Sequence, residues 1–222
     1  MTNTIFIQIA SYRDPELNST LLNCIENAKW PENLRFTICW QHADEDLWDN
    51  LDNWKEDSRF NILDFKYTDA KGACWARNQI QQQYNGEKYT LHLDSHHRFI
   101  KNWDEELINM HSNLVLEGYK KPLITSYLPS YFPDKEPENR VMECWQLDFS
   151  RFTPEGYIWT QPSTLSSSYE KPMHSRLFSA HFVFTYGEHA RDVQHDPEMY
   201  FHGEEPSLAA RSFTHGYDLF HP

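Results

Sequence analysis

Asp94 and His96 are the side chains in this 222-residue chain that are best suited to bind a metal ion. They follow a mostly apolar run, Tyr89 to Leu93, that is typical of a buried strand. Residues two apart on an extended backbone point to the same side. A carboxylate and a neutral imidazole suit a divalent cation such as Mn²⁺ or Mg²⁺, with water or phosphate oxygens in the remaining positions. A strand end capped by polar residues explains this Asp94-Ser95-His96 stretch, the DSH triplet, equally well.

Three more polar clusters lie at predicted strand ends or helix starts. In residues 11–14, SYRD, an aromatic ring beside a cation can stack on a base and pair with a phosphate, and a solvated helix-capping turn is the alternative. In residues 71–77, KGACWAR, Gly72 lets a ligand approach a helix start that favours anions, and Arg77 follows; a helix with one exposed arginine is the alternative. In residues 202–205, HGEE, the adjacent carboxylates suit binding of sugar hydroxyls or of a cation, and a solvated acidic helix N-terminus is the alternative. Together the clusters indicate a nucleotide-sugar pocket.

The elements that must position these residues alternate between strands and helices. Strands are predicted at 4–10, 34–40, 60–65, 89–93 and 123–127, and helices at 14–28, 44–56, 71–83 and 103–116. This alternation predicts an α/β fold in which helices flank a mostly parallel central sheet. Ligands of such sheets bind at the carboxyl ends of the strands, where Arg13 and Asp94 both lie.

The pattern changes after residue 127. It predicts a proline-rich loop at 128–140, strands at 141–152 and 157–161, a serine-rich loop at 162–168, a strand at 177–186 broken by His181, and a short helix after HGEE. No internal repeat or long linker separates domains. We therefore expect one domain over 1–222, with a nucleotide-sugar-binding part at 1–127 and a smaller β-rich, acceptor-side part at 128–222.

Composition narrows the class of protein. The 33 acidic residues outnumber the 20 basic ones, so the chain repels nucleic acid and anionic membranes, and nucleic-acid binding is not expected. The four cysteines form no CxxC pair, which argues against a zinc site or a disulfide framework. Reduced thiols, the lack of a signal peptide and the lack of a run of ~20 apolar residues predict a soluble, cytoplasmic protein without a transmembrane segment.

Several motifs closely resemble the polypeptide α-N-acetylglucosaminyltransferases, typified by the cytoplasmic enzyme that modifies protein hydroxyproline. They are IASYRDPEL (9–17), GACWAR (72–77), LHLDSHHRF followed by WD (91–104), and HGEE with AARSFTHGYDLFHP (202–222). The resemblance spans nearly the whole chain with its motifs in order. More distantly, the DSH triplet is similar to that of the mucin-type polypeptide GalNAc-transferases. The resemblance implies a GT-A fold, UDP-GlcNAc as the donor, a divalent metal and a retaining transfer.

The resemblance also implies roles for individual residues. Asp94 and His96 correspond to metal ligands, and Glu204 corresponds to a donor-sugar contact with Glu205 beside it near the acceptor; these two glutamates are the expected catalytic pair. The expected nucleotide-binding residues are Ala10, Ser11, Tyr12, Arg13, Arg77 and Ser95. In these relatives a third metal ligand is a histidine beyond the proline that Pro222 matches. Either the chain is truncated, or His215 or His221 substitutes, or the metal keeps more water.

The sequence therefore predicts a metal-dependent, retaining glycosyltransferase that moves GlcNAc from UDP-GlcNAc to a hydroxyl acceptor on a protein or glycan. One alternative is transfer of another UDP-sugar to a bacterial-type polysaccharide. Another is a catalytically silent sugar-nucleotide or glycan-binding domain of a larger, multidomain protein. Residues 128–171 match no motif, and acceptor specificity is expected there.

Overall fold

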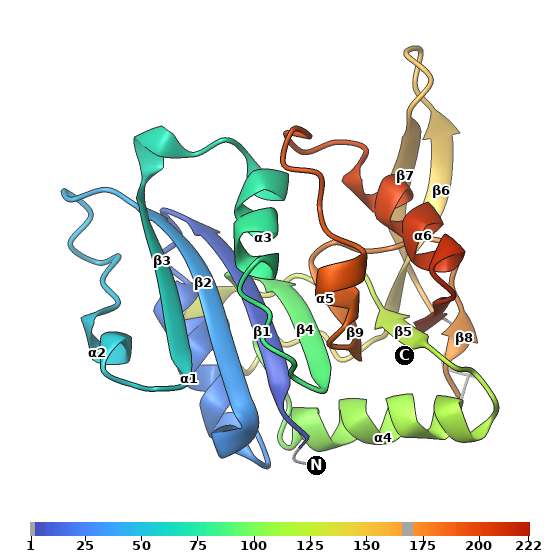
Figure 1. Ribbon diagram of the computed structural model, residues 1–222, viewed down its shortest axis with the longest axis horizontal. Helices are drawn as coiled ribbons and strands as arrows, with labels where there is room; N and C mark the ends of the chain where they lie inside the picture. Colours follow the sequence, from blue (N-terminus) through green and yellow to red (C-terminus); the bar gives the residue numbers. More distant parts are fainter. Residues whose placement is uncertain (1–2, 166–170) are drawn as a thin grey trace.

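The computed structural model, which describes residues 3–165 and 171–222, is built on an eight-stranded sheet in the order β3-β2-β1-β4-β9-β5-β10-β8 (Figure 1). β1 to β4 run parallel, β9 pairs antiparallel with both β4 and β5, and β10 pairs parallel with β5 and antiparallel with β8. The strands are β1 (Ile5–Tyr12), β2 (Leu34–His42), β3 (Phe60–Lys66), β4 (Tyr89–Asp94), β5 (Pro122–Thr125), β8 (Met173–His174), β9 (Phe182–Tyr186) and β10 (Asp218–His221).

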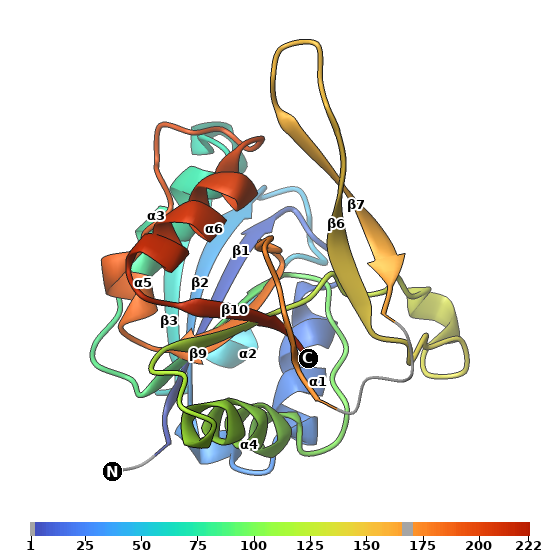
Figure 2. The same ribbon diagram turned by 90° about the vertical axis from the view of Figure 1, so that its right-hand side faces the viewer.

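Helices cover both faces of the sheet, because the strands are apolar on both sides. Helices α1 and α4 lie on one face of the sheet and α3 lies on the other (Figure 2). On β1, Ile5, Ile7 and Ile9 belong to the core cluster that includes residues of α1 and α4, whereas Phe6 belongs to the cluster that includes Ile80 of α3. The helices are α1 (Leu17–Asn27), α2 (Asp52–Lys55), α3 (Ala73–Gln81), α4 (Trp103–Leu116), α5 (His189–Asp192) and α6 (Glu204–Thr214), with 3₁₀ turns at Pro31–Asn33, Tyr67–Asp69 and Pro133–Lys135. Sheets buried on both faces are a property of α/β proteins, and the predicted fold class is confirmed.

A separate two-stranded ribbon, β6 (Trp145–Phe152) and β7 (Ile158–Thr164), stands out from the body of the molecule (Figures 1 and 2). The expected strands at 141–152 and 157–161 both form, but β6 begins only at Trp145 and β7 continues to Thr164, into the expected serine-rich loop. Residues 166–168 of that loop lie outside the described part of the chain.

The helix expected at 44–56 is wrong except for the single turn of α2. Aspartate side chains in this segment bond to distant partners, since Asp46 pairs with Arg13 and Asp49 accepts a hydrogen bond from the Trp40 indole N–H at 2.6 Å. Such side-chain bonds compete with helix formation. The leucines of this segment do not share one buried face either, because Leu47 is 87% exposed while Leu51 is buried.

The strand expected at 177–186 covers only β9, because residues 177–181 turn before the strand begins. In that turn, His181 accepts a hydrogen bond from the Leu128 N–H at 2.9 Å. The short elements β8, α5 and β10 were not predicted; each has four residues or fewer, too few to show a periodicity. No helix in residues 3–165 or 171–222 is both long and apolar enough to cross a bilayer.

Candidate active site

The carboxyl ends of β1 and β4 lie side by side at the centre of the sheet, with Ala10 opposite Asp94 in the register. Because β1 has β2 on one side and β4 on the other, the chain order reverses between them, which is where ligands of open α/β sheets bind. Arg13 follows β1 and Asp94 ends β4, as the sequence predicted. Parallel pairing thus brings residues more than 80 positions apart to one edge.

Arg77 connects the DSH triplet to the HGEE motif. Its guanidinium donates from Nη2 to Asp94 Oδ1 at 2.8 Å and from Nη1 to Glu204 Oε1 at 2.7 Å. Arg77 is only 6% exposed, so the alternative of a helix with one exposed arginine is wrong. Burial acts to raise the pKa of Asp94, but the charge of Arg77 together with the nearby histidines His97, His181 and His96 outweighs burial, and the pKa is lowered. Asp94 is therefore held as a carboxylate with Oδ1 engaged.

His96 is oriented by Asp14, which stands just before α1. Asp14 Oδ2 accepts hydrogen bonds from Ser95 Oγ at 2.5 Å and from His96 Nδ1 at 2.7 Å. Burial opposes ionisation of Asp14, yet these bonds lower its pKa to about 2. A carboxylate acceptor requires a proton on Nδ1, so Nε2 of the neutral ring keeps its lone pair.

The free atoms of the DSH triplet fit a divalent cation. His96 Nε2 lies 3.9 Å from Asp94 Oδ2, the oxygen that Arg77 leaves free. Two ligands each about 2.1 Å from one metal can be up to about 4.2 Å apart, so both atoms can reach the same ion. Asp14 plays the part of an outer-shell carboxylate that fixes the histidine tautomer.

A third protein ligand does not emerge from the histidines nearby. His97 Nε2 accepts the Asp94 N–H at 3.1 Å, and both ring nitrogens of His181 are engaged, by the Leu128 N–H and by Ser179 Oγ. The two expected substitutes, His215 and His221, each bond through Nδ1 to a backbone carbonyl, of Arg211 and of Thr125 respectively, so only their Nε2 atoms could bind a metal. Within the described residues, no three His, Cys, Asp or Glu side chains form a metal-binding group.

The end of β1 forms an aromatic and cationic surface beside the DSH triplet. Ser11 and Tyr12 belong to the strand rather than to a turn, so the expected solvated cap begins only at Arg13. Tyr12 is 54% exposed and meets Tyr67 edge to face, with ring centroids 6.4 Å apart. The Arg13 guanidinium lies 4.7 Å from the centre of the Tyr67 ring and pairs with Asp46 at 2.6 Å. The two tyrosines therefore offer ring surface next to a fixed cation.

The two glutamates of HGEE begin α6 and point to different partners. Glu204 is buried and bonded to Arg77, so the alternative of a solvated helix start is wrong for it. Glu205 Oε1 accepts the Ala180 N–H at 3.0 Å. Burial, with the Glu204 charge adding to it, raises the pKa of Glu205 to about 7 despite that bond. Glu205 is thus a carboxyl that gains and loses a proton near neutral pH.

Gly72 has a role other than the one expected. Its φ of +105° favours glycine, and a Cβ there would lie 2.6 Å from the Tyr200 carbonyl oxygen and 2.7 Å from the Tyr200 ring. The space in front of Gly72 is therefore filled by the segment leading to Glu204, not by a ligand. This packing places α6 against the start of α3.

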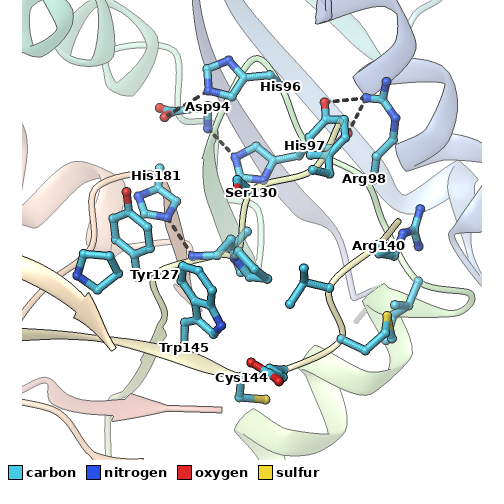
Figure 3. Close-up of a pocket in the computed structure, with 18 of the residues that line it drawn as sticks. Asp94, His96, His97, Arg98, Tyr127, Ser130, Arg140, Cys144, Trp145 and His181 are labelled. Carbon is cyan, nitrogen blue, oxygen red and sulfur yellow. Dashed lines mark hydrogen bonds and ion pairs between the residues drawn. The ribbon is translucent and has the colours of Figure 1, made fainter. Parts of the chain in front are cut away.

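A cavity of about 620 Å³ opens beside the DSH triplet (Figure 3). Asp94, His96 and His97 lie along one side of it, and the segment from Tyr127 to Trp145, with His181 packed against Tyr127, lines the rest. The lining residues of this segment were not predicted from the sequence, because they come from the chain between β5 and the start of β6, which has no recognisable sequence motif. Arg98 links the two sides, since it bonds to Glu16 at 2.5 Å and to the Tyr131 hydroxyl at 3.0 Å.

Comparisons with known proteins identify the family and the fold. A family model described as Glycosyltransferase (GlcNAc) matches residues 4–58 and 50–222. Comparison with curated proteins gives no match. Solved structures with similar folds include GalNAc-T7 with UDP, GalNAc and Mn²⁺ (TM-score 0.67, 12% identity, 98% of this chain) and S. aureus TarS 1–349 with UDP-GlcNAc (0.60, 9%, 99%). A third is the mannosyltransferase PcManGT from Pyrobaculum calidifontis with GDP-Man and Mn²⁺ (0.59, 13%, 98%).

These structures share the fold with this chain at low identity. The chain spans 42% of the GalNAc-T7 chain, 58% of the TarS chain and 54% of the mannosyltransferase chain. The shared architecture is the GT-A fold of glycosyltransferases, as expected from the motifs, whereas the hydroxyproline-modifying subfamily is not distinguished by these matches. Because the family model covers nearly the whole chain, the chain belongs to the GlcNAc glycosyltransferase family.

Proposed function

We propose that this chain catalyses a metal-dependent, retaining transfer of N-acetylglucosamine from UDP-GlcNAc to a hydroxyl group on a protein or glycan. The observation that carries the proposal is the pair of free atoms, Asp94 Oδ2 and His96 Nε2, at the point where the strand order reverses. Family membership supports a glycosyltransferase, and the UDP, UDP-GlcNAc and Mn²⁺ named for similar structures support the donor and the metal.

The residues at the sheet edge divide the work of binding the donor. Asp94 and His96 hold Mn²⁺ or Mg²⁺, which neutralises diphosphate charge and makes UDP a better leaving group. Tyr12 and Tyr67 present ring faces to the uracil base, with Arg13 fixed beside them. The backbone between the base and the metal is formed by Ala10, Ser11 and Ser95.

Arg77 and the two glutamates act at the sugar. Arg77 holds Glu204 against the metal side of the site, and the lone pairs left on the Glu204 oxygens accept hydrogen bonds from sugar hydroxyls. Glu205 lies beside it with a pKa of about 7, so its carboxylate form is available to accept a hydrogen bond from the acceptor hydroxyl. In a retaining transfer the acceptor attacks on the face of the leaving group, and no nucleophilic side chain is assigned.

The cavity of about 620 Å³ is the proposed acceptor side. It adjoins the DSH triplet, and its far wall belongs to the segment after residue 127 for which no motif was found. Tyr127, Tyr131 and Trp145 give it aromatic surfaces that suit the apolar faces of a peptide or a sugar. This assignment makes residues 128–222 the acceptor-side part of the domain.

The test is release of UDP from a panel of UDP-sugars with Mn²⁺ and candidate acceptors, for the wild type and for Asp94→Ala. We expect UDP-GlcNAc to be turned over fastest and Asp94→Ala to lose turnover, since one of two protein ligands is gone. Wild-type rates in Asp94→Ala at saturating metal would overturn the metal assignment. Arg191→Met serves as the control, because its exposed pair with Asp192 lies away from the site.

A silent sugar-nucleotide-binding domain is the second candidate. The observation that favours it is the two-residue protein donor set among the described residues. Calorimetry with UDP, with and without Mn²⁺, separates the candidates when combined with the release assay. Metal-dependent UDP binding without release from any UDP-sugar would support the silent domain.

A further inference from the structure

The second oxygen of Glu204 has its own set of buried neighbours. Oε1 accepts from Arg77, whereas Oε2 lies 3.1 Å from Cys74 Sγ and 3.5 Å from His195 Nε2. Cys74 and His195 are both buried and come from α3 and from the loop after α5. A carboxylate whose remaining lone pairs point in fixed directions needs a hydrogen-bond donor on each oxygen. Either Cys74 or His195 must therefore donate to Oε2.

His195 is not the donor, because its tautomer is fixed from the other side of the ring. Gln81 Oε1 accepts the His195 backbone N–H at 2.8 Å, which settles the orientation of the Gln81 amide. The same oxygen lies 3.3 Å from His195 Nδ1, so Nδ1 carries the proton. Burial and then the Arg77 charge lower the pKa of His195 well below its usual value, so the ring is neutral and Nε2 has no hydrogen to give.

Cys74 is the donor that remains. Burial, followed by the Glu204 charge, raises the pKa of Cys74 to about 12, so the thiol keeps its proton at neutral pH. The same sulfur lies 4.0 Å from the Phe201 carbonyl oxygen, in the turn that leads into Glu204. A thiol is a weak donor, but its acceptor is a buried carboxylate, which strengthens the bond.

We propose that Cys74 is a positioning residue for the donor sugar, which acts by donating its S–H to Glu204 Oε2 and so fixing the carboxylate between the thiol and Arg77. The inference rests on the proposed function only in naming the sugar as the group that Glu204 binds. Cys74 thus provides a second contact that is distinct from that of Arg77. The guanidinium connects Glu204 to the metal side of the site, and the thiol connects it to the start of α3.

The test compares the affinity of wild type, Cys74→Ala and Cys74→Ser for UDP and for UDP-GlcNAc in Mn²⁺ by calorimetry. UDP lacks the GlcNAc group that Glu204 is proposed to contact, so its dissociation constant should not change. For Cys74→Ala we expect UDP-GlcNAc to bind about tenfold more weakly, because the Glu204 carboxylate is no longer held on both oxygens and must be ordered when the sugar binds. Cys74→Ser should restore most of the affinity, since a hydroxyl also donates. Cys39→Ala is the matched control, a buried thiol in β2.

A purely structural role for Cys74 would give different results. Equal weakening of UDP and UDP-GlcNAc, failure of serine to restore affinity, or unchanged affinity in Cys74→Ala would each overturn the proposal. Infrared spectroscopy supplies a readout independent of any donor: the S–H stretching band of Cys74 should lie at lower frequency than those of the other thiols and return toward them in Glu204→Gln. A wild type that binds UDP but not UDP-GlcNAc would overturn the proposed donor instead, while the infrared shift would still decide the Cys74 bond.

Discussion

Replacement of Arg77 tests the electrostatic centre of the site most directly. The guanidinium is buried and pairs with two carboxylates, Asp94 and Glu204, through bonds of 2.8 and 2.7 Å. Arg77→Met keeps an apolar stem of similar shape but leaves both carboxylates without their cation. The Asp94 side chain is 31% exposed and regains water, whereas the Glu204 side chain is only 6% exposed and regains little.

The magnitude follows from that difference in exposure. Removing one partner of a buried ion pair costs about 3–5 kcal/mol, mostly because the remaining charge is left unpaired. We therefore expect Arg77→Met to lower the free energy of unfolding by about 3–4 kcal/mol, with Glu204 as the main cause. A second substitution, Glu204→Gln, removes the unpaired charge, so the double variant should recover about 1–2 kcal/mol relative to Arg77→Met alone.

The assay is urea unfolding at pH 7.5 without divalent metal, followed by the fluorescence of the eight tryptophans. Arg191→Met, which breaks an exposed pair with Asp192, is the control and should change stability by less than about 0.5 kcal/mol. A loss of under about 1 kcal/mol for Arg77→Met, or a double variant less stable than the single one, would refute the reasoning. Either result would mean that solvent rather than Arg77 neutralises Glu204.

Three other substitutions address separate parts of the site. Asp14→Asn removes the carboxylate that orients His96, and we expect the apparent Mn²⁺ affinity to fall about 10–100-fold in a metal titration of UDP release, whereas unchanged affinity would contradict the role of Asp14. Burial raises the pKa of Glu205 from 4.5 to about 7, so the folded state holds this proton more tightly than the unfolded state. The free energy of unfolding should therefore fall as the pH rises from about 4.5 to about 7, and in urea titrations Glu205→Gln should lack this pH dependence. Gly72→Ala places a Cβ 2.6 Å from the Tyr200 carbonyl oxygen at a φ of +105°, so thermal unfolding should show a loss of about 2 kcal/mol or more, and a loss of under about 0.5 kcal/mol would mean that the Tyr200 segment yields easily.

Much of the first 127 residues was predictable from periodicity. The helix at 103–116 matches α4 at both ends, and the five early strands form within two residues of their predicted bounds. These elements have long apolar patterns, so their own local sequence determines their secondary structure. The segment 44–56 failed because Asp46 and Asp49 bond to Arg13 and to Trp40, partners that a local pattern cannot reveal. The short β8, α5 and β10 exist because neighbouring strands and helices hold them.

By itself the sequence determined the chemical groups at the site and the strand ends that carry them: Asp94 and His96 after one strand, Arg13 after another, and Glu204 at a helix start. Only the tertiary structure decided which of them meet. Arg77 became the buried link between Asp94 and Glu204, Asp14 became the partner of His96, and Cys74 became the donor to Glu204. The physical reason is that charge pairing and burial depend on distances between segments up to 130 residues apart, which the packing of strands and helices sets and local sequence does not.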